Sequence, residues 1–361
     1  MRAAILHDGA DDLVIDEIEH DAPGPHEVVI GIEACGLCHS DLHYLDGTLV
    51  RPRPQVLGHE AAGVAEAVGS AVQSISVGDR VVTCLLAGCG ACPSCQRGAP
   101  GLCTRPEAIR RGPGERPRLT TLDGTAVTAM AGVGALAERV LMDGRGVIAI
   151  PNDVPVELAA LLGCAVVTGL GAVFHVAQVR PGDTVAVIGC GGVGLNVIQG
   201  ARIAGAARIV AIDANPHKLP LAGELGATDL VDASAGDPVD VVRGLTAAGV
   251  DYAFEVVGRP ATVAMALEMT APGRTACVVG VMSDDAEITI PAIHLRRGKS
   301  LRGVYMGGGQ PQVDIPRYVE LWRRGLLDLE SMVSRTLTLD EVNEGFRALA
   351  SGEVARAVVR F

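Results

Sequence analysis

The stretch Thr184-Val-Ala-Val-Ile188 is followed by Gly189-Cys-Gly-Gly-Val-Gly194 and then by a helix-patterned segment, residues 195–205. An apolar run, a glycine turn and a helix in this order are typical of the first βαβ unit of a dinucleotide-binding domain. Gly189 would allow the tight bend, Gly191 and the adjacent Gly192 would let the backbone approach a pyrophosphate, and Gly194 would allow close packing of helix on strand. The alternative is a turn without a ligand, because a chain with 46 glycines produces such spacings by chance.

The next apolar run, residues 208–212, ends in Asp213, which lies nineteen residues after Gly194. A carboxylate at the tip of this strand would bind both ribose hydroxyls of an adenosine and would repel a 2′-phosphate, so the pattern favours NAD over NADP. Strand and helix patterns then alternate. They predict a doubly wound parallel sheet, with further strands at 229–231, 252–256 and 276–281 and helices near 239–245 and 262–269.

Length and composition set the broad class. With 361 residues and 48% hydrophobic side chains, the chain is expected to form two domains. The 42 acidic against 30 basic residues give a net charge of -12, which argues against a nucleic-acid or anionic-membrane surface and favours a small-molecule partner. Residues 1–7 lack the features of an export signal, and no stretch offers eighteen uninterrupted apolar residues, so we expect a soluble, cytoplasmic protein.

The ten cysteines are clustered, which favours metal binding over disulfides in a reducing compartment. Cys89, Cys92, Cys95 and Cys103 form a C-x2-C-x2-C-x7-C pattern, which indicates a closed, tetrahedral, structural zinc site. An iron–sulfur loop shares the first spacings and free thiols are a further alternative, but the fourth spacing and Thr104 do not fit the ferredoxin pattern.

The first 83 residues carry short apolar runs at 28–32, 62–68 and 80–83, broken by Gly and Pro, and predict an irregular β-rich domain. Within it lie Cys38-His39-Ser40-Asp41-Leu42-His43 and Gly58-His59-Glu60, a density of metal-binding and proton-handling side chains that packing does not require. Residues 104–127 are rich in Arg, Pro and Gly. They are either a solvated surface loop or a segment that covers the active-site entrance or a subunit contact, with one arginine binding an anionic substrate group.

Together these patterns resemble the zinc-dependent alcohol dehydrogenases of the medium-chain dehydrogenase/reductase superfamily, class I/III-like, over nearly the whole chain. The resemblance includes Cys164 and the C-terminal Gly352-Glu-Val-Ala-Arg356. It implies an α/β protein with a GroES-like, β-rich catalytic domain at 1–165, a Rossmann NAD-binding domain at 166–305, and a segment at 306–361 that returns to the catalytic domain.

The resemblance also implies residue roles at the reaction centre. Cys38, His59 and Cys164 would bind a catalytic zinc with one open position, although His59 and Cys164 alone could be core residues. Glu60 would lie behind the zinc, and Asp41 would orient the ligand imidazole. Ser40 would accept the alcohol proton and pass it through the nicotinamide ribose to His43, whose alternative is a solvated surface histidine.

The remaining implied contacts concern cofactor and substrate. His39 and Arg356 would contact the pyrophosphate, Lys218 the adenosine ribose, and Thr168 and Val193 the nicotinamide; an exposed helix lysine is the alternative for Lys218. Where some relatives place aromatic residues, this chain has smaller ones, which favours bulky or long-chain alcohols. The candidate pocket residues, besides Ser40, are Leu85, Met130, Val281 and Tyr305.

The expected protein is therefore an NAD-dependent enzyme with two zinc ions per chain that transfers a hydride between NAD(H) and an alcohol/aldehyde or ketone pair. One alternative is a dehydrogenase of S-hydroxymethyl thiol adducts, in which arginines at 104–118 would bind the thiol's carboxylate. Another is a non-catalytic NAD(H) sensor, which would predict broken ligands or a broken relay. The long loop after the four cysteines favours a homodimer, joined through strands near 276–281 and 301–305.

Overall fold

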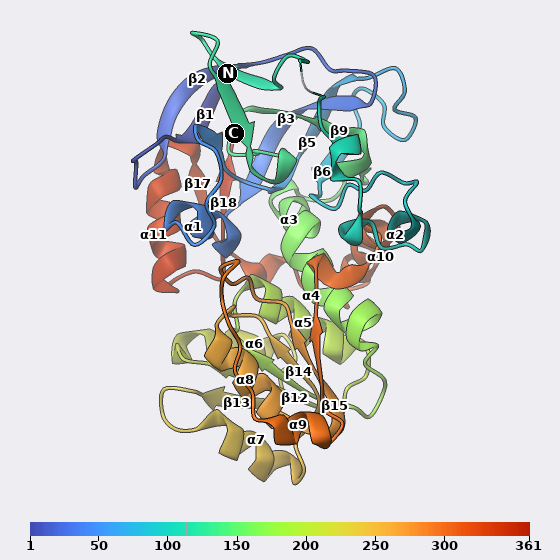
Figure 1. Cartoon of the computed structure of the whole chain (residues 1–361), viewed down its shortest axis with the longest axis vertical. Coiled ribbons are helices and arrows are strands. Elements are labelled where there is room, and N and C mark those ends of the chain that lie inside the picture. Colours follow the sequence, from blue (N-terminus) through green and yellow to red (C-terminus); the bar gives the residue numbers. More distant parts are fainter. Residues whose placement is uncertain (113) are drawn as a thin grey trace. The chain divides into compact units, whose positions relative to one another are not determined.

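The computed structural model describes residues 1–112 and 114–361 and divides into two compact units. The first consists of Met1–Cys164, Gln310–Trp322 and Val333–Phe361, and the second of Ala165–Gly309 and Arg323–Met332 (Figure 1). The C-terminal segment predicted at 306–361 is thus divided between the units, because residues 306–309 and 323–332 belong to the second unit and the other residues to the first.

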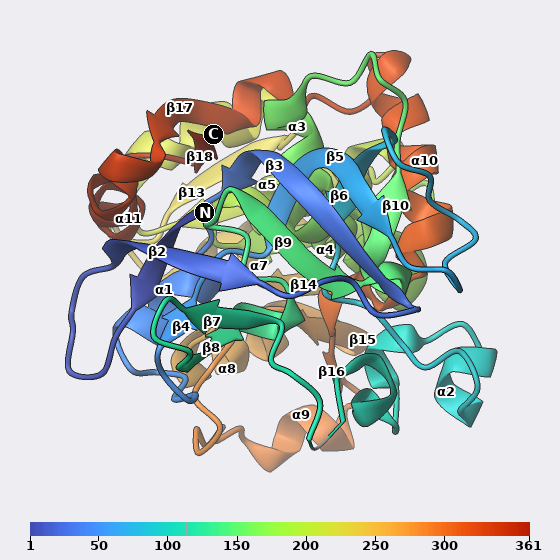
Figure 2. The same cartoon turned by 90° about the horizontal axis from the view of Figure 1, so that it is seen from above.

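The first unit is built from two β-structures. One is a closed barrel in the order β1-β2-β7-β8-β4, with bounds Arg2–Leu6, Val14–His20, Leu119–Thr121, Ala126–Ala129 and Gln55–Val56. The other is a seven-stranded sheet in the order β10-β6-β5-β3-β18-β17, with bounds Val147–Ala149, Arg80–Thr83, Glu60–Val68, Glu27–Gly36, Arg356–Arg360 and Val333–Thr338. Its remaining strand, β9 (Arg139–Asp143), pairs with the other side of β3, and Figure 2 shows β9, β3, β5, β6 and β10 side by side.

The helices of this unit are α1 (His39–Leu45), α2 (Pro93–Gln96), α3 (Val156–Leu161), α10 (Pro311–Arg323) and α11 (Val342–Ser351), of which α3 and α11 contact strands of the sheet. The core combines apolar side chains of β3, β5 and β9 with the buried face of α11, including Val342, Phe346 and Leu349. Strand β18, close to the C-terminus, pairs with β3, so the last residues of the chain complete the sheet that begins near residue 27.

The second unit is a six-stranded, all-parallel sheet in the order β13-β12-β11-β14-β15-β16. In the same order, its strands are Asp229–Asp232, Arg208–Asp213, Thr184–Ile188, Val250–Glu255, Thr270–Val278 and Ser300–Gly303. Its helices α4 to α9 are Val167–Gly171, Gly192–Ile203, Leu219–Glu224, Pro238–Thr246, Pro260–Met269 and Ala292–Arg296. From the central strand β11, the chain first adds β12 and β13 on one side and then β14, β15 and β16 on the other. Because parallel crossovers are right-handed, α5 and α6 cover one face and α7 and α8 the other, which is the doubly wound arrangement predicted from the sequence.

Several predicted elements coincide with observed ones, and others differ at their ends. Strands β6 and β11 occupy the predicted residues 80–83 and 184–188. The strand predicted at 276–281 begins earlier, at Thr270, and ends at Val278. In this last case the chain leaves the sheet where Val279 and Gly280 donate to the carbonyl of Glu255.

One helical run, Val156–Ala177, is long and apolar enough by composition to cross a membrane, with a mean hydropathy of 2.0. It comprises α3, a π-helical segment (Leu162–Val166), α4 and a second π-helical segment (Ala172–Ala177). Since 94% of this apolar window is buried inside the protein, its composition is that of a core helix.

Candidate functional site

Four side chains from three separate segments converge in the first unit. Cys38 precedes α1, His59 and Glu60 lie at the start of β5, and Cys164 lies in the π-helical segment after α3. Their ligand atoms all lie within 4.8 Å of one another, and His59 Nε2 is 3.2 Å from Cys164 Sγ. All four are buried. Two sulfurs and one imidazole nitrogen around one point suit a zinc ion that keeps a fourth position open.

Asp41 is the buried group that orients this cluster. Its Oδ2 accepts from the amide of Cys38 at 3.0 Å, and its Oδ1 accepts from the amide of Gly58 at 2.9 Å. The same Oδ1 lies 3.4 Å from His59 Nδ1, which leaves Nε2 directed toward the sulfurs. Asp41 thus contacts both ligand-bearing segments. Burial alone would lower the pKa of His59, but the adjacent carboxylate outweighs it and the pKa is raised.

Behind the cluster, Glu60 forms a buried ion pair with Arg356, with Oε1 3.1 Å from Nη2. Burial raises the pKa of Glu60 to about 7, although Arg356 opposes this shift. Arg356 is 2% exposed and donates from Nη1 to the carbonyl of Leu37 at 3.3 Å. The structure therefore places Arg356 at the predicted metal site, and the pyrophosphate contact expected for it stays a prediction.

Helix α1 presents the predicted proton-relay residues. Ser40 and His43 are one turn apart, a spacing that places side chains on the same face, and both are half-buried. His43 Nδ1 lies 3.9 Å from the carboxylate of Asp46, and its side chain is 22% exposed, which gives the imidazole access to solvent. His39 is exposed at the start of the helix.

The four cysteines of the C-x2-C-x2-C-x7-C segment form a second metal cluster, with all sulfurs within 4.8 Å of one another. The Sγ atoms of Cys89 and Cys95 are 3.9 Å apart, as are those of Cys92 and Cys103. A tetrahedral zinc with Zn–S bonds of about 2.3 Å would separate its sulfurs by about 3.8 Å. An iron–sulfur cubane binds each cysteine to a different iron and holds the sulfurs farther apart. The geometry fits a single ion.

Backbone amides favour thiolates in this cluster. The amide of Cys92 donates to Cys89 Sγ at 3.2 Å, and that of Arg105 donates to Cys103 Sγ at 3.4 Å. The amide of Cys95 lowers the pKa of the Cys92 thiol to about 5. Since thiolates are the form that binds zinc, these contacts favour metal binding at Cys89 and Cys92, whereas burial raises the pKa of the Cys95 thiol to about 12.

The arginine-rich loop is anchored by two of its arginines. Arg111 forms ion pairs with Asp21 at 2.7 Å and with Glu27 at 2.6 Å, and Arg118 pairs with Glu27 at 2.6 Å. Sequence reasoning missed both partners, which lie in and before β3. Arg111 and Arg118 therefore attach the loop to the first unit. Arg105, Arg110 and Arg116 are exposed, although Arg116 also lies 3.5 Å from Asp21. Pro113, also in this loop, lies outside the described residues.

In the second unit, the glycine turn joins β11 to α5 as predicted. Gly189 has φ +101°, in the region that favours glycine, and a Cβ on Gly194 would lie 1.8 Å from the carbonyl oxygen of Gly189. A Cβ on Gly191 would meet nothing within 4 Å. The space in front of Gly191 is therefore open, at the N-terminus of α5 where a pyrophosphate would bind. Gly192 is buried as the first residue of this helix.

Asp213 ends β12 beside this turn. Its Oδ2 accepts from the amide of Cys190 at 2.7 Å and its Oδ1 from the amide of Asn215 at 2.8 Å. The carboxylate is thus held at the carboxyl edge of the sheet, between β12 and β11, where dinucleotides bind in folds of this order. Val193 and Lys218 are half-buried, and Thr168 is buried, with its hydroxyl 3.4 Å from the sulfur of Met306.

The candidate pocket residues have different environments. Leu85 is partly buried against the core of the first unit, and Met130 belongs to that core with 2% exposure, so the structure does not place Met130 on an open wall. In the second unit Val281 is 39% exposed and Tyr305 is 54% exposed.

A residue that sequence reasoning missed is Glu255, at the carboxyl end of β14. Its carboxylate is 0% exposed, and Oε1 accepts from the amides of Val257 and Gly258 and from the hydroxyl of Thr262. Glu255 pairs with Ile188, the residue before the glycine turn. The sequence signal that could have identified Glu255 is an acidic residue at the end of an apolar run. In the fold, Glu255 lies between β11 and β14, where the strand order of the sheet reverses.

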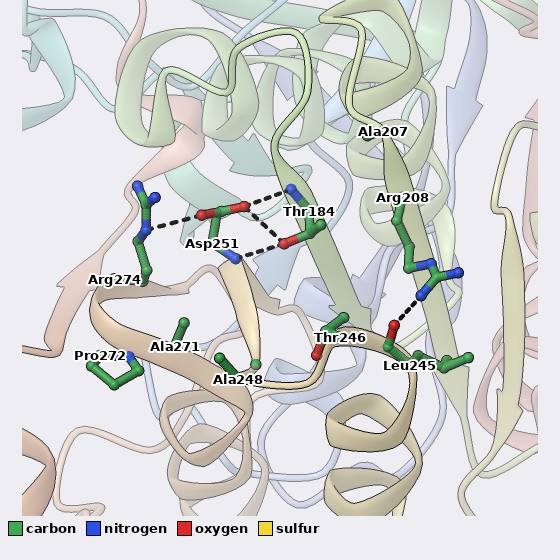
Figure 3. A pocket seen from close by; sticks show the side chains of 11 residues that line it. Thr184, Ala207, Arg208, Leu245, Thr246, Ala248, Asp251, Ala271, Pro272 and Arg274 are labelled. Carbon is green, nitrogen blue, oxygen red and sulfur yellow. Dashed lines mark hydrogen bonds and ion pairs between the residues drawn. The ribbon is translucent and has the colours of Figure 1, made fainter.

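A cavity of about 690 Å³ opens at the opposite, amino edge of the same sheet (Figure 3). Its polar groups contact one another. Asp251 accepts from Thr184 at 2.8 Å and pairs with Arg274 at 2.9 Å, while Arg208 is directed toward the carbonyl of Leu245. Because cofactors bind at the carboxyl edge of parallel sheets, this cavity is not the dinucleotide site.

Comparison with known proteins agrees with this description. Residues 24–152 match the alcohol dehydrogenase GroES-like domain, and residues 192–324 match the zinc-binding dehydrogenase domain. These are the two domain types that the fold defines: a GroES-like unit with two clustered metal-ligand sets, and a Rossmann unit with an open glycine turn.

Solved structures of similar proteins span the whole chain. An alcohol dehydrogenase zinc-binding domain protein from Burkholderia ambifaria is 34% identical, with a TM-score of 0.94 over 100% of this chain and 98% of that one. The benzyl alcohol dehydrogenase of Acinetobacter calcoaceticus is 29% identical, with a TM-score of 0.90 over 100% and 99%. A zinc-binding dehydrogenase from Sinorhizobium meliloti 1021, bound to NADP, is 28% identical, with a TM-score of 0.79 over 100% and 99%.

The chain therefore belongs to the zinc-dependent alcohol dehydrogenases of the medium-chain dehydrogenase/reductase superfamily. It is an oxidoreductase of the zinc-binding dehydrogenase type that uses a nicotinamide cofactor.

Proposed function

We propose that the protein is an NAD-dependent, class I/III-like alcohol dehydrogenase that holds two zinc ions per chain and oxidises bulky or aryl primary alcohols, or reduces the corresponding aldehydes. The observation that carries the proposal is the buried cluster of Cys38, His59 and Cys164, whose ligand atoms lie within 4.8 Å of one another. Three protein ligands of this kind leave the fourth coordination position of a zinc ion open for an alcohol oxygen. A non-catalytic NAD(H) sensor would not need this arrangement.

The residues around the cluster support proton removal as well as binding. Zinc in such a site supplies Lewis-acid stabilisation of negative charge on the substrate oxygen, and the nicotinamide supplies the hydride acceptor. Asp41 holds the tautomer of His59 through Nδ1. We infer that Ser40 accepts the alcohol proton and that His43, whose side chain is 22% exposed, releases it to solvent. The ribose of a bound cofactor would lie between these two side chains.

The choice of NAD rests on Asp213. Its carboxylate is fixed beside the glycine turn by two backbone amides. A 2′-phosphate placed near this carboxylate would be repelled, whereas a ribose diol would donate hydrogen bonds to it. We propose that Lys218 and Val193 complete the cofactor contacts, with Thr168 near the nicotinamide.

The proposed substrate class rests on the side chains expected at the pocket. The family resemblance predicts that Leu85 stands where some relatives have an aromatic residue, which would narrow the site. The similar protein from Acinetobacter calcoaceticus is a benzyl alcohol dehydrogenase. Dehydrogenation of S-hydroxymethyl thiol adducts is less well supported, because two of the five arginines at 104–118, Arg111 and Arg118, are committed to Asp21 and Glu27.

The experiment is a comparison of kcat/KM for benzyl alcohol, octanol and ethanol, with NAD and with NADP, on protein whose zinc content is known. We expect benzyl alcohol or octanol to exceed ethanol by about tenfold or more, which corresponds to about 1.4 kcal/mol of transition-state binding. A preference for ethanol would contradict the substrate class, and a preference for NADP would contradict the cofactor. A parallel arm with formaldehyde and several thiols tests the thiol-adduct activity.

We also propose that the enzyme is a cytoplasmic homodimer. The edge strand β16 pairs with β15 on one side only among the described strands, so its other side is available for a second copy. The ten cysteines are all unpaired, which suits a reducing compartment. Sedimentation velocity would distinguish a dimer from a monomer or tetramer.

A further inference from the structure

Arg145 lies in a rigid turn between β9 and β10, beside the four-cysteine cluster. The turn is the short 3-10 segment Gly144–Gly146. The amide of Gly144 donates to the carbonyl of His26 at 2.8 Å, and the carbonyl of Gly146 accepts from the amide of Cys84 at 2.8 Å. A Cβ on Gly146 would lie 2.7 Å from the carbonyl oxygen of Cys84. The backbone that carries Arg145 is therefore fixed on the sheet of the first unit.

The guanidinium of Arg145 is oriented by Asp143, two residues earlier. Nε donates to Oδ1 and Nη2 to Oδ2, both at 2.7 Å, and the side chain of Asp143 is only 7% exposed. Two parallel hydrogen bonds of this kind fix both position and plane of a guanidinium.

The other donors of Arg145 reach the segments on either side of the cysteine cluster. Nη1 donates to the carbonyl of Cys89 at 3.4 Å, and Nη2 donates to the carbonyl of Ala108 at 2.7 Å. Cys89 is the first of the four cysteines, and Ala108 lies five residues after the last, Cys103. One side chain thus connects the sheet to both ends of the cysteine segment.

The charge of Arg145 also suits this place. Four thiolates around one Zn²⁺ leave a net charge of about 2−, which a fixed neighbouring cation stabilises. The pKa of Arg145 is raised, mainly by its hydrogen bonds to Asp143, with Cys89 and Cys103 contributing in the same direction.

We propose that Arg145 is a positioning residue for the metal of the four-cysteine cluster. It fixes the carbonyl of Cys89 and the loop at Ala108 relative to the sheet and slows the opening through which the metal leaves. This inference rests on the proposal that the cluster holds zinc.

The test measures loss of the metal at this cluster alone. Zinc-loaded protein is incubated with EDTA and iodoacetamide, and mass spectrometry follows alkylation of each cysteine-containing peptide with time. Arg145→Met removes the connection, and Arg145→Lys keeps the charge but not the planar fork. Arg139→Met and Arg139→Lys are the matched controls, because Arg139 lies on β9 and pairs with Glu66 at 2.6 Å, an interaction that does not involve the cysteine segment.

We expect Arg145→Met to speed alkylation of the four cluster cysteines about tenfold and Arg145→Lys about threefold, with Cys38 and Cys164 unchanged. Both controls should behave like the wild type. The inference is overturned if the Arg145→Met rates lie within about twofold of the Arg139→Met rates. Should Arg145→Met not fold, Arg145→Lys against Arg139→Lys decides by the same comparison.

The wild-type protein separates this result from a failure of the zinc proposal. If zinc loading does not protect the four cysteines of the wild type, the cluster is not a zinc site and the proposed metal content is wrong. If loading protects them and the Arg145 variants are protected equally, only the inference about Arg145 fails.

Discussion

Gly191 and Gly194 lie three residues apart in the same turn, yet a side chain would have different consequences at each. On Gly194 a Cβ would lie 1.8 Å from the carbonyl oxygen of Gly189, so β11 and α5 would have to separate. On Gly191, with φ −84° and ψ −172°, a Cβ fits the backbone and meets nothing within 4 Å.

We therefore expect Gly194→Ala to lower the free energy of unfolding by about 1–3 kcal/mol. Gly191→Ala should leave stability nearly unchanged and weaken NADH binding about tenfold, because its methyl group would occupy the space of the pyrophosphate. Urea unfolding and fluorescence titration with NADH measure the two effects. Wild-type NADH affinity in Gly191→Ala would mean that the pyrophosphate does not bind at this turn.

The carboxylate of Glu27 contributes to stability in a way that can be measured by changing the pH. Burial alone would raise its pKa, but hydrogen bonds from Arg111, from the amide of Gly24 and from Arg118 outweigh this and lower the pKa from 4.5 to about 2. A depressed pKa in the folded state means that the carboxylate stabilises the fold fully above about pH 4.5. This contribution is lost progressively as the pH falls from there toward 2.

Replacing Glu27 with Gln should then lower the free energy of unfolding at pH 7 by up to about 3 kcal/mol. The difference from the wild type should shrink as the pH is lowered from 5 to 3. Urea unfolding at a series of pH values measures it, with Glu66→Gln, in the exposed pair with Arg139, as the control. A difference that stays constant across this range would show that Glu27 acts through packing and not through its charge.

At the scale of elements, the sequence predicts best where a single segment contains the whole signal. Strands β6 and β11 are short apolar runs between turn residues, and both coincide with the structure residue by residue. The glycine turn and the four-cysteine cluster are likewise local, because the spacing of residues along the chain already determines which atoms can meet.

Contacts between distant segments were not predictable in this way. Arg111 and Asp21 are 90 residues apart, and nothing in either segment specifies the other. The closed barrel depends on pairing β4 with β8, whose strands are only two and four residues long. The position of Arg356 beside Glu60 likewise follows from the pairing of β18 with β3, which joins the two ends of the chain.

The π-helical segment Leu162–Val166 is the element that connects chain packing to the buried cluster. Gly163 precedes Cys164, and a Cβ on Gly163 would lie 1.8 Å from the carbonyl oxygen of Thr83. The hydroxyl of Thr83 in turn lies 3.4 Å from the carbonyl of His59, so a displacement here would move two ligand-bearing segments.

We expect Gly163→Ala to retain about one zinc per chain instead of two and to lose about tenfold or more in turnover. Zinc content by atomic emission and steady-state rates measure both. Gly244→Ala is the control, because a Cβ at Gly244 in α7 would meet nothing within 4 Å. Full zinc content in Gly163→Ala would show that the segment tolerates the shift without disturbing the cluster.

At the scale of the whole molecule, the two cysteine clusters differ in what surrounds them. The catalytic candidates lie in a unit with an extensive apolar core, and Cys164 belongs to a helical run that is 94% buried over its apolar window. The four-cysteine segment contains only α2, which has four residues, and the 3-10 turn Pro100–Leu102. We therefore expect a segment with so little regular structure to depend on the proposed zinc for its stability.

Removing one ligand from each cluster should therefore separate folding from turnover. Cys92→Ser should lower the melting temperature by about 5 °C or more, since a loss of 1 kcal/mol shifts it by about 2–4 °C in domains of this size. Cys164→Ser should abolish turnover and change the melting temperature by less than about 2 °C.

The control is Cys277→Ser, at a 0% exposed position in the second unit outside both clusters. It should keep two zinc ions per chain and wild-type turnover. Equal destabilisation in Cys92→Ser and Cys164→Ser, beyond that of the control, would mean that the site of Cys164 stabilises the fold as much as the four-cysteine cluster does, which contradicts the expected separation of folding from turnover.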